Sequence, residues 1–149
     1  MEDPIVEAAQ VAFSVRLKNS SDVSENTKNA QAIAKGWRSA VHALDPDRFE
    51  IEAIVSPEFD QKIDIVDREQ GFAYEFKVSG KSAPAEFYKD IVKVILWNKK
   101  RKKKLSKLIF ITEEKWGRPL LDAPMPRAYI QYLADLGLDV LVKYVRHHP

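Results

Sequence analysis

Apolar residues recur at helical spacing in two stretches at the start of the chain. The first stretch covers residues 4–18. Asp3 before it suits the cap of a helix, and Pro4 suits the first helical position. The second covers residues 22–43 and ends before the turn-forming residues 45–47. The pattern therefore predicts two helices ahead of any strand.

From residue 48 apolar and polar residues alternate, which is typical of β-strands. The first alternating run places its apolar side chains on one face: Phe49, Ile51, Ala53 and Val55. Two further runs, residues 62–66 and 72–78, flank a turn at residues 67–71 and predict a hairpin. In its second strand one face receives Phe72, Tyr74, Phe76 and Val78, and the other receives Ala73, Glu75 and Lys77.

The remaining pattern predicts a crossover unit followed by one more helix and strand. A helix over residues 87–100 precedes a continuous apolar run at residues 108–111, which we expect to form a strand parallel to residues 72–78. A helix over residues 126–137 and a strand over residues 138–145 complete the chain. We predict a single α/β domain with a mixed sheet of about five strands flanked by helices, in the order α-α-β-β-β-α-β-α-β.

The predicted hairpin brings two carboxylates and an ammonium group onto one face. A turn of about four residues places Asp64 opposite Glu75, with Cβ atoms about 5 Å apart, and Lys77 lies next on the same face. Two adjacent carboxylates repel each other unless a cation lies between them, and Mg²⁺ with its oxygen ligands fits such a gap. Asp60 is a second candidate acid, which we expect in the loop before the strand.

Asp64 followed by Glu75-Phe76-Lys77 resembles the signature of the PD-(D/E)XK nuclease superfamily. The flanking pattern is similar too, because an apolar strand surrounds the Asp and a helix follows the Glu-x-Lys strand. The resemblance covers roughly residues 48–112. It implies a restriction-endonuclease-like fold and hydrolysis of DNA phosphodiester bonds.

The resemblance also implies roles for individual residues. Asp64 and Glu75 would bind Mg²⁺, or Mn²⁺ in its place, with the backbone carbonyl of Phe76 as a third ligand. Lys77 would orient or help to deprotonate the attacking water and stabilise the charge that develops on the phosphorus. Many members carry a further acid on a helix before the first strand, for which Glu7 and Glu25 are the candidates. Cutting both strands of DNA would require a homodimer.

A basic run follows the predicted third helix. Six positive charges occupy residues 99–104, and Lys99, Lys100 and Arg101 are candidate phosphate contacts. The alternative is a solvated helix end, where cations are favourable. Lys81 and Ser82, in the loop after the Glu-x-Lys strand, are two more candidate nucleic-acid contacts.

Composition adds few constraints to this interpretation. The 149 residues are 45% hydrophobic and 31% charged, with a net charge of +2, as in a soluble globular protein. The absence of cysteine excludes disulfides and thiolate metal sites, and the three histidines lack the spacing of zinc ligands. Because the sequence shows neither an apolar span nor the basic start of a signal peptide, we expect a cytoplasmic protein that does not enter a membrane.

Three less specific interpretations stay open. Asp64, Glu75 and Lys77 can form ordinary cross-strand ion pairs on an exposed face. The chain can be a non-catalytic module that binds nucleic acid or protein with the same fold. It can also be a structural subunit. For the last interpretation Trp97 is informative, because a helical projection places it with Lys93 on the polar face, where it would contact DNA or a second subunit.

Overall fold

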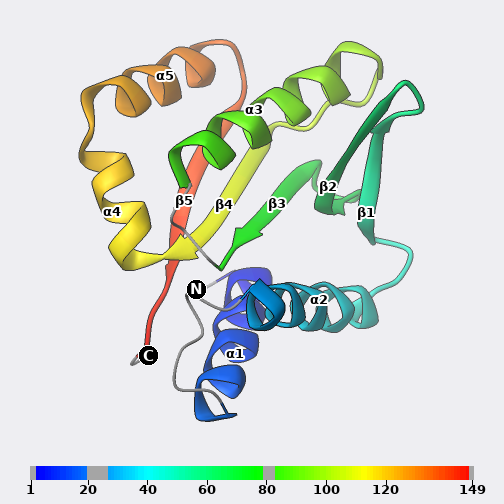
Figure 1. The fold of residues 1–149 in the computed structure, drawn as a ribbon. Coiled ribbons are helices and arrows are strands. Elements are labelled where there is room, and N and C mark those ends of the chain that lie inside the picture. The colour runs from blue at the N-terminus through cyan, green and yellow to red at the C-terminus, as the bar shows by residue number, and fades with distance from the viewer. Residues whose placement is uncertain (1–2, 20–26, 79–82, 148–149) are drawn as a thin grey trace.

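The computed structural model describes residues 3–19, 27–78 and 83–147 and shows one mixed sheet flanked by helices (Figure 1). The predicted α/β class with a five-stranded mixed sheet is confirmed. In chain order the elements are α1 (Pro4–Asn19), α2 (Thr27–Leu44), β1 (Phe49–Ser56), β2 (Phe59–Asp67), β3 (Phe72–Lys77), α3 (Ala83–Lys99), β4 (Lys107–Glu113), α4 (Glu114–Asp122), α5 (Pro124–Asp135) and β5 (Asp139–Val145).

The strands lie in the sheet in chain order, β1-β2-β3-β4-β5. β1, β2 and β3 form an antiparallel meander, whereas β4 and β5 each run parallel to the strand before them. The parallel pairing of β3 with β4, which joins Phe72 to Lys107 and Lys77 to Thr112, confirms the predicted crossover through α3. The carboxyl ends of β3, β4 and β5 therefore meet at one edge of the sheet.

Each face of the sheet is covered by its own group of helices. α1 and α2 lie below the sheet in Figure 1, and α3, α4 and α5 lie on the other face. The α1–α2 core includes Phe13, Trp37, Tyr74, Phe76, Val78 and Ile111. The α3–α5 core includes Ala73, Phe87, Ile91, Trp97, Phe110 and Leu133. The predicted division of the β3 side chains between two faces is thus confirmed.

Asp3 begins the first helix as predicted and also ties it to the sheet. The Ile5 amide donates a hydrogen bond of 2.9 Å to Oδ1 of Asp3, which caps α1. The Tyr74 hydroxyl donates to the other carboxylate oxygen at 2.8 Å. One carboxylate therefore satisfies the start of α1 and a buried phenol of β3 together.

The turn between β2 and β3 is held by Asp67, whose side chain is buried. Its Oδ1 accepts hydrogen bonds from the amides of Glu69 and Gln70, at 3.0 and 3.1 Å. The Arg48 guanidinium donates to both of its oxygens, at 3.0 and 2.9 Å. These contacts fix the turn, and with it the register of the hairpin that carries Asp64 and Glu75.

The prediction that the apolar side chains of β1 share one face is wrong. Phe49 packs in the α1–α2 core, whereas Ala53 and Val55 pack in the α3–α5 core. Glu52, between them, has a φ of 48°, a conformation that is uncommon for residues with a side chain. The strand rotates there, and the pairs Ile51↔Ile65 and Ala53↔Ile63 show that β2 keeps its register across the rotation.

The buried face of α3 is also rotated from the predicted one. The apolar residues of this helix recur at helical spacing and predict a buried face that includes Val92 and Ile95. Both are exposed, at 46% and 39%. Lys93 and Trp97, expected on the polar face, are buried, at 6% and 8%. The burial of Trp97 contradicts the expectation that its indole lies on the polar face, where it would contact DNA or a second subunit.

The segment after β4 contains a helix that the sequence did not predict. α4 begins at Glu114 directly after β4, and α5 starts at Pro124, two residues before the predicted start. Gly117 lets α4 lie close to the sheet, because a Cβ there would be 2.6 Å from the Tyr144 ring. Gly117 and Pro119 lie inside α4, where their low helix propensity hid the helix. No helix in the described ranges has the length and apolar character needed to cross a membrane.

Candidate functional site

The candidate site lies where β2 and β3 separate. Their backbone pairing extends from Asp67↔Phe72 to Ile65↔Tyr74, a register that continues to the predicted pair Asp64 and Glu75. At that pair, carboxylate oxygens replace backbone carbonyls as the acceptors for amides of the facing strand. The Asp64 amide donates to Oε1 of Glu75 at 2.9 Å, and the Phe76 amide donates to Oδ2 of Asp64 at 3.0 Å.

Lys77 completes the predicted group and also faces the start of α3. Its Nζ lies 3.8 Å from Oε2 of Glu75, 3.6 Å from Oε2 of Glu86 and 4.0 Å from Oδ2 of Asp90. The structure therefore brings Asp64, Glu75 and Lys77 together on one face. It adds two acids from α3 that sequence reasoning missed.

A second lysine, also missed, lies deeper in the site. Nζ of Lys93 is 2.7 and 3.0 Å from the two carboxylate oxygens of Glu75 and 3.0 Å from Oδ1 of Asp90. It also donates a hydrogen bond of 2.7 Å to the backbone carbonyl of Lys62 on β2. Glu86, Asp90 and Lys93 recur at intervals of four and three residues beside the buried Phe87, Ile91 and Val94, which is the signal that could have revealed them.

The site has a buried inner part and an accessible outer part. The side chains of Glu75 and Asp90 are 0% exposed and that of Lys93 is 7% exposed. The side chains of Asp64 and Lys77 are 18% and 24% exposed. A ligand from solvent would therefore meet Asp64 and Lys77 first, with Glu75 behind them.

Burial controls the electrostatics of the two inner acids. It raises the pKa of Glu75 well above its ordinary value, and the carboxylates of Asp64 and Asp90 add to this rise while Lys93 and Lys77 oppose it. Burial likewise raises the pKa of Asp90, against the opposing effect of the same two lysines. Both carboxylates are therefore less stable as anions than in water, and an added cation would stabilise them.

For Lys77 and Lys93, neighbouring carboxylates and not burial decide the direction of the pKa shift. Burial alone would lower the pKa of Lys77, but the carboxylates of Asp90, Glu75, Asp64 and Glu86 outweigh it and the pKa is raised. The pKa of Lys93 is raised in the same way, because Glu75 and Asp90 outweigh burial. Lys77 among these carboxylates keeps its proton at neutral pH, which favours a charge-stabilising role over that of a base.

Arg38 approaches the site from α2, where sequence reasoning expected an acid. Its Nη1 lies 4.0 Å from Oδ1 of Asp64, the oxygen that does not accept the Phe76 amide. Glu7 is exposed on α1, and Glu25 lies outside the described residues. The helix layer that precedes β1 therefore contributes a cation to this site.

The donor chemistry of the site fits a hard divalent cation in part. Asp64, Glu75 and Asp90 offer carboxylate oxygens, and those of the fully buried Asp90 face the ammonium groups of Lys93, at 3.0 Å, and Lys77, at 4.0 Å. Against this, Lys93 already neutralises Glu75. Across residues 3–19, 27–78 and 83–147, no group of three or more His, Cys, Asp or Glu side chains is placed to bind a metal. Asp64 and Glu75 are the two side chains that would hold a metal ion at this site.

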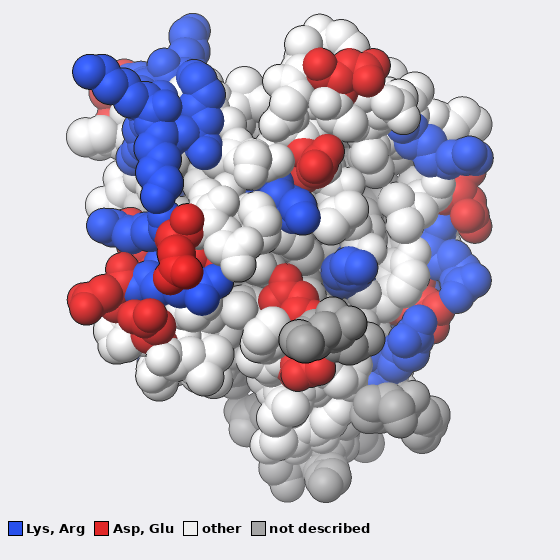
Figure 2. Space-filling model, turned by 180° about the vertical axis from the view of Figure 1, so that it is seen from behind, with Lys and Arg blue, Asp and Glu red and all other residues white. Residues whose placement is uncertain are grey.

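Two of the predicted nucleic-acid contacts also have partners within the chain. Arg101 donates from Nη1 to the Val55 carbonyl at 2.9 Å and from Nη2 to the Ile54 carbonyl at 3.1 Å. Nζ of Lys100 lies 2.8 Å from Oε2 of Glu58. Lys99, like residues 102–104, is exposed, whereas Lys81 and Ser82 lie outside the described residues. Lys and Arg side chains gather at one upper corner of Figure 2, over the end of α3 and the β1–β2 turn.

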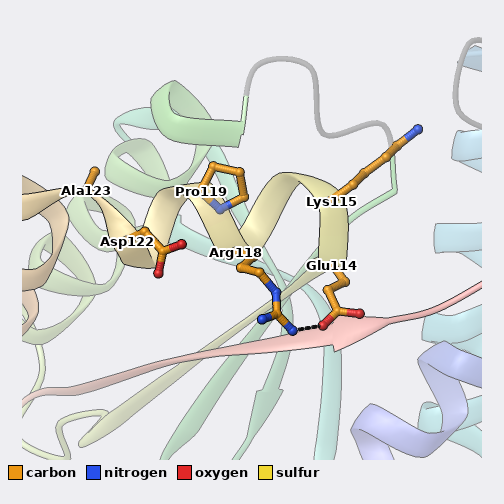
Figure 3. A pocket seen from close by; sticks show the side chains of 6 residues that line it. All are labelled: Glu114, Lys115, Arg118, Pro119, Asp122 and Ala123. Atoms are coloured by element: carbon orange, nitrogen blue, oxygen red, sulfur yellow. Dashed lines mark hydrogen bonds and ion pairs between the residues drawn. The ribbon is translucent and has the colours of Figure 1, made fainter.

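Two other features lie outside this site. Asp60, expected in a loop, lies inside β2 and is exposed, so it does not join the other acids. A separate hollow on α4 is lined by Glu114, Lys115, Arg118, Pro119, Asp122 and Ala123 (Figure 3). There Glu114 and Arg118 form an ion pair with each other.

Comparison of the chain with family models, with curated proteins and with solved structures gave no match. Function is therefore inferred from the geometry of Asp64, Glu75 and Lys77 and from the residues around them.

Proposed function

We propose that this chain is a Mg²⁺-dependent nuclease of the PD-(D/E)XK type that hydrolyses phosphodiester bonds in DNA. One observation carries the proposal: Asp64, Glu75 and Lys77 share one partly exposed site at the point where β2 and β3 separate. The succession of a helix, three antiparallel strands, a crossover helix and a parallel strand also supports a restriction-endonuclease-like fold.

In this proposal the chain binds the metal through one accessible carboxylate, that of Asp64, and the buried carboxylate of Glu75 behind it. Asp64 and Glu75 hold Mg²⁺, or Mn²⁺ in its place, and the backbone carbonyl of Phe76 is the proposed third ligand. The ion supplies Lewis-acid stabilisation of the scissile phosphate. The Lys77 ammonium donates hydrogen bonds to the attacking water and to the phosphate oxygens as negative charge develops.

The proposed partners follow from the charge of the surrounding surface. Arg38 beside Asp64 and the exposed lysines of residues 99–104 can contact DNA phosphates. Cleavage of both strands calls for two such sites, so we propose that the chain acts as a homodimer in the cytoplasm.

A cleavage assay with matched variants tests the proposal. Wild type, Glu75→Gln, Lys77→Met and the surface control Tyr132→Phe, exposed on α5, are incubated with duplex, single-stranded and branched DNA in Mg²⁺, Mn²⁺ or EDTA. We expect cleavage by wild type and Tyr132→Phe that EDTA abolishes, and a loss of about a hundredfold or more in the two site variants. DNA retention in Ca²⁺ stays within about twofold in both site variants, because neither side chain supplies most of the phosphate contacts.

Two results would overturn it. One is the absence of cleavage by wild type on every substrate with either metal. The other is cleavage by Glu75→Gln at the wild-type rate, which would assign the activity to another site or another protein.

The second candidate is a nucleic-acid-binding module with the same fold and no catalysis. The contacts of Lys93 with both oxygens of Glu75 favour it, because that carboxylate is already neutralised inside the chain. DNA retention without metal binding and without cleavage would support this alternative over the nuclease.

A further inference from the structure

The Lys93 ammonium group is surrounded by oxygen atoms from three elements. Four oxygens lie within 3.0 Å of Nζ: both from Glu75 on β3, one from Asp90 on α3 and the Lys62 carbonyl on β2. An ammonium group has three N–H donors, so it meets more oxygens than it has protons to give. Carboxylates and a backbone carbonyl are also the ligands that divalent cations such as Mg²⁺ and Ca²⁺ take in proteins.

This arrangement differs from an ordinary ion pair in the core. Asp90 is fully buried, and in the described part of the chain its oxygens have only the ammonium groups of Lys93, at 3.0 Å, and Lys77, at 4.0 Å, as partners. A carboxylate held in this way costs free energy that an apolar residue would avoid. Lys93 binds Glu75 on the side that faces α3, while Asp64 and Lys77 lie on its more exposed side. Glu75 therefore separates an inner cation position from an outer one.

We propose that the Lys93 ammonium occupies the position of a second divalent ion, so that the centre binds a single metal ion between Asp64 and Glu75. This inference rests on the proposed metal-dependent function of the same site. The tethered ammonium supplies one fixed positive charge to Glu75 and Asp90 and keeps the inner oxygens from taking a metal. Removing it should convert a site for one ion into a site for two.

The stoichiometry of bound Mn²⁺ tests the inference without any measurement of activity. Free and bound Mn²⁺ are counted by electron paramagnetic resonance in wild type, Lys93→Ala and Lys93→Ala/Asp90→Asn. We expect one bound ion in wild type, two in Lys93→Ala and one in the double variant, in which the inner position has lost a carboxylate. Lys93→Gln, which keeps a hydrogen-bond donor for Glu75, is the second variant if Lys93→Ala does not fold, and two ions are again expected.

The remaining outcomes separate the inference from the function it rests on. One ion in both wild type and Lys93→Ala, two ions in wild type, or two ions in the double variant would overturn the inference and leave the proposed function standing. No ion in wild type and none in Lys93→Ala would overturn both. No ion in wild type and one in Lys93→Ala would mean that Lys93 fills the only cation position, which also overturns both.

Discussion

The carboxylates of Asp64 and Glu75 each accept a hydrogen bond from a backbone amide of the opposite strand. The Asp64 amide donates to Oε1 of Glu75 at 2.9 Å, and Oδ2 of Asp64 accepts the amide of Phe76 at 3.0 Å. These two bonds hold the strands at the distance at which their backbones no longer pair. The two acids therefore help to position the strands of the site, in addition to the metal-binding role proposed for them.

This double role predicts different effects for two substitutions of Asp64. Asp64→Asn keeps an oxygen acceptor for the Phe76 amide, so we expect a change of less than about 0.5 kcal/mol in the free energy of unfolding. Asp64→Ala leaves that amide without its acceptor and should cost about 1–2 kcal/mol. Both substitutions should weaken Mn²⁺ binding at least tenfold. Urea unfolding and Mn²⁺ titration check the pair, and equal stability of the two variants would contradict the role of Asp64 in holding the strands.

Lys93→Ala should destabilise the fold strongly and in a pH-dependent way. It removes the nearer of the two cations beside the buried Glu75 and Asp90, because Lys77 lies at 3.8 and 4.0 Å, and we expect a cost of about 3–5 kcal/mol near neutral pH. Because burial raises the pKa of Glu75 and of Asp90, each folded carboxyl binds its proton more tightly than the unfolded one. Stability of the variant is then highest below the unfolded carboxyl pKa of about 4 and is lost as pH rises through the raised folded values.

Urea unfolding at several pH values measures this effect. Lys62→Ala is the matched control, because Lys62 is exposed and contributes only its backbone carbonyl to Lys93. We expect the control to unfold like wild type throughout. A Lys93→Ala variant whose loss of stability is the same at pH 5 and pH 8 would show that the buried acids do not depend on Lys93.

The register of the hairpin could be predicted, whereas the inner half of the site could not. Alternation in the strands and the turn-forming Asp67 set which residues of β2 and β3 are opposite, and both are local features of sequence. The orientation of α3 depends on a contact between distant residues, in which the buried Glu75 draws Lys93 inward. A helical projection based only on the apolar residues of this helix places Lys93, and Trp97 beside it, on the solvent-facing side.

Other misses have similarly specific causes. The rotation of β1 occurs at Glu52, whose φ of 48° has no sequence signal, because a glycine or asparagine would be expected there. Arg38 lies on a helix whose distance from β2 is set by packing of the α1–α2 core. The sequence therefore predicted the strand that carries Glu75 and Lys77 but not the helices that face it.

Tyr74 should make the fold sensitive to alkaline pH. Burial raises the pKa of its phenol, and the hydrogen bond to Asp3 raises it further. The folded state thus holds the phenolic proton more tightly than the unfolded state, so stability is full below the unfolded pKa of about 10 and is lost as pH rises above it. Tyr74→Phe should cost about 1 kcal/mol at neutral pH and remove much of the alkaline loss.

Thermal or urea unfolding between pH 7 and pH 11 checks this expectation. The exposed Tyr132 provides the control, since Tyr132→Phe should change neither the neutral stability nor the alkaline loss. If Tyr74→Phe keeps the wild-type alkaline loss, a different group controls stability in that range.

Arg38 should bind a DNA phosphate next to the metal. Its guanidinium is 4.0 Å from Asp64, too far for a strong bond, and its side chain is 19% exposed. Arg38→Gln should weaken DNA retention and lower the slope of log affinity against log salt by about one. Because Arg38 also competes for the Asp64 carboxylate, the same variant should bind Mn²⁺ more tightly. Filter binding at several salt concentrations measures the slope, and tighter Mn²⁺ binding without any change in DNA retention would restrict Arg38 to a role in neutralising Asp64.

Within the basic run after α3, Arg101 should contribute to stability, whereas the exposed Lys102 should not. Arg101 donates to the carbonyls of Val55 and Ile54, and its guanidinium carbon lies 3.5 Å from the centre of the Trp97 ring. Arg101→Ala should therefore cost about 1–3 kcal/mol of stability. Lys102→Gln, in the exposed part of the run, should change stability by less than about 0.5 kcal/mol.

Arg101 and Lys102 should have the opposite ranking in DNA retention from the one they have in stability. If the exposed lysines contact phosphates, Lys102→Gln weakens DNA retention at low salt while the fold stays intact. The variant makes one phosphate contact fewer, so its binding releases fewer counterions. Arg101→Gln, measured well below its unfolding transition, should retain DNA nearly as wild type does, since its donors already serve β1. Unchanged stability of Arg101→Ala, with a large loss of DNA retention, would reverse this assignment and return Arg101 to the DNA-binding surface.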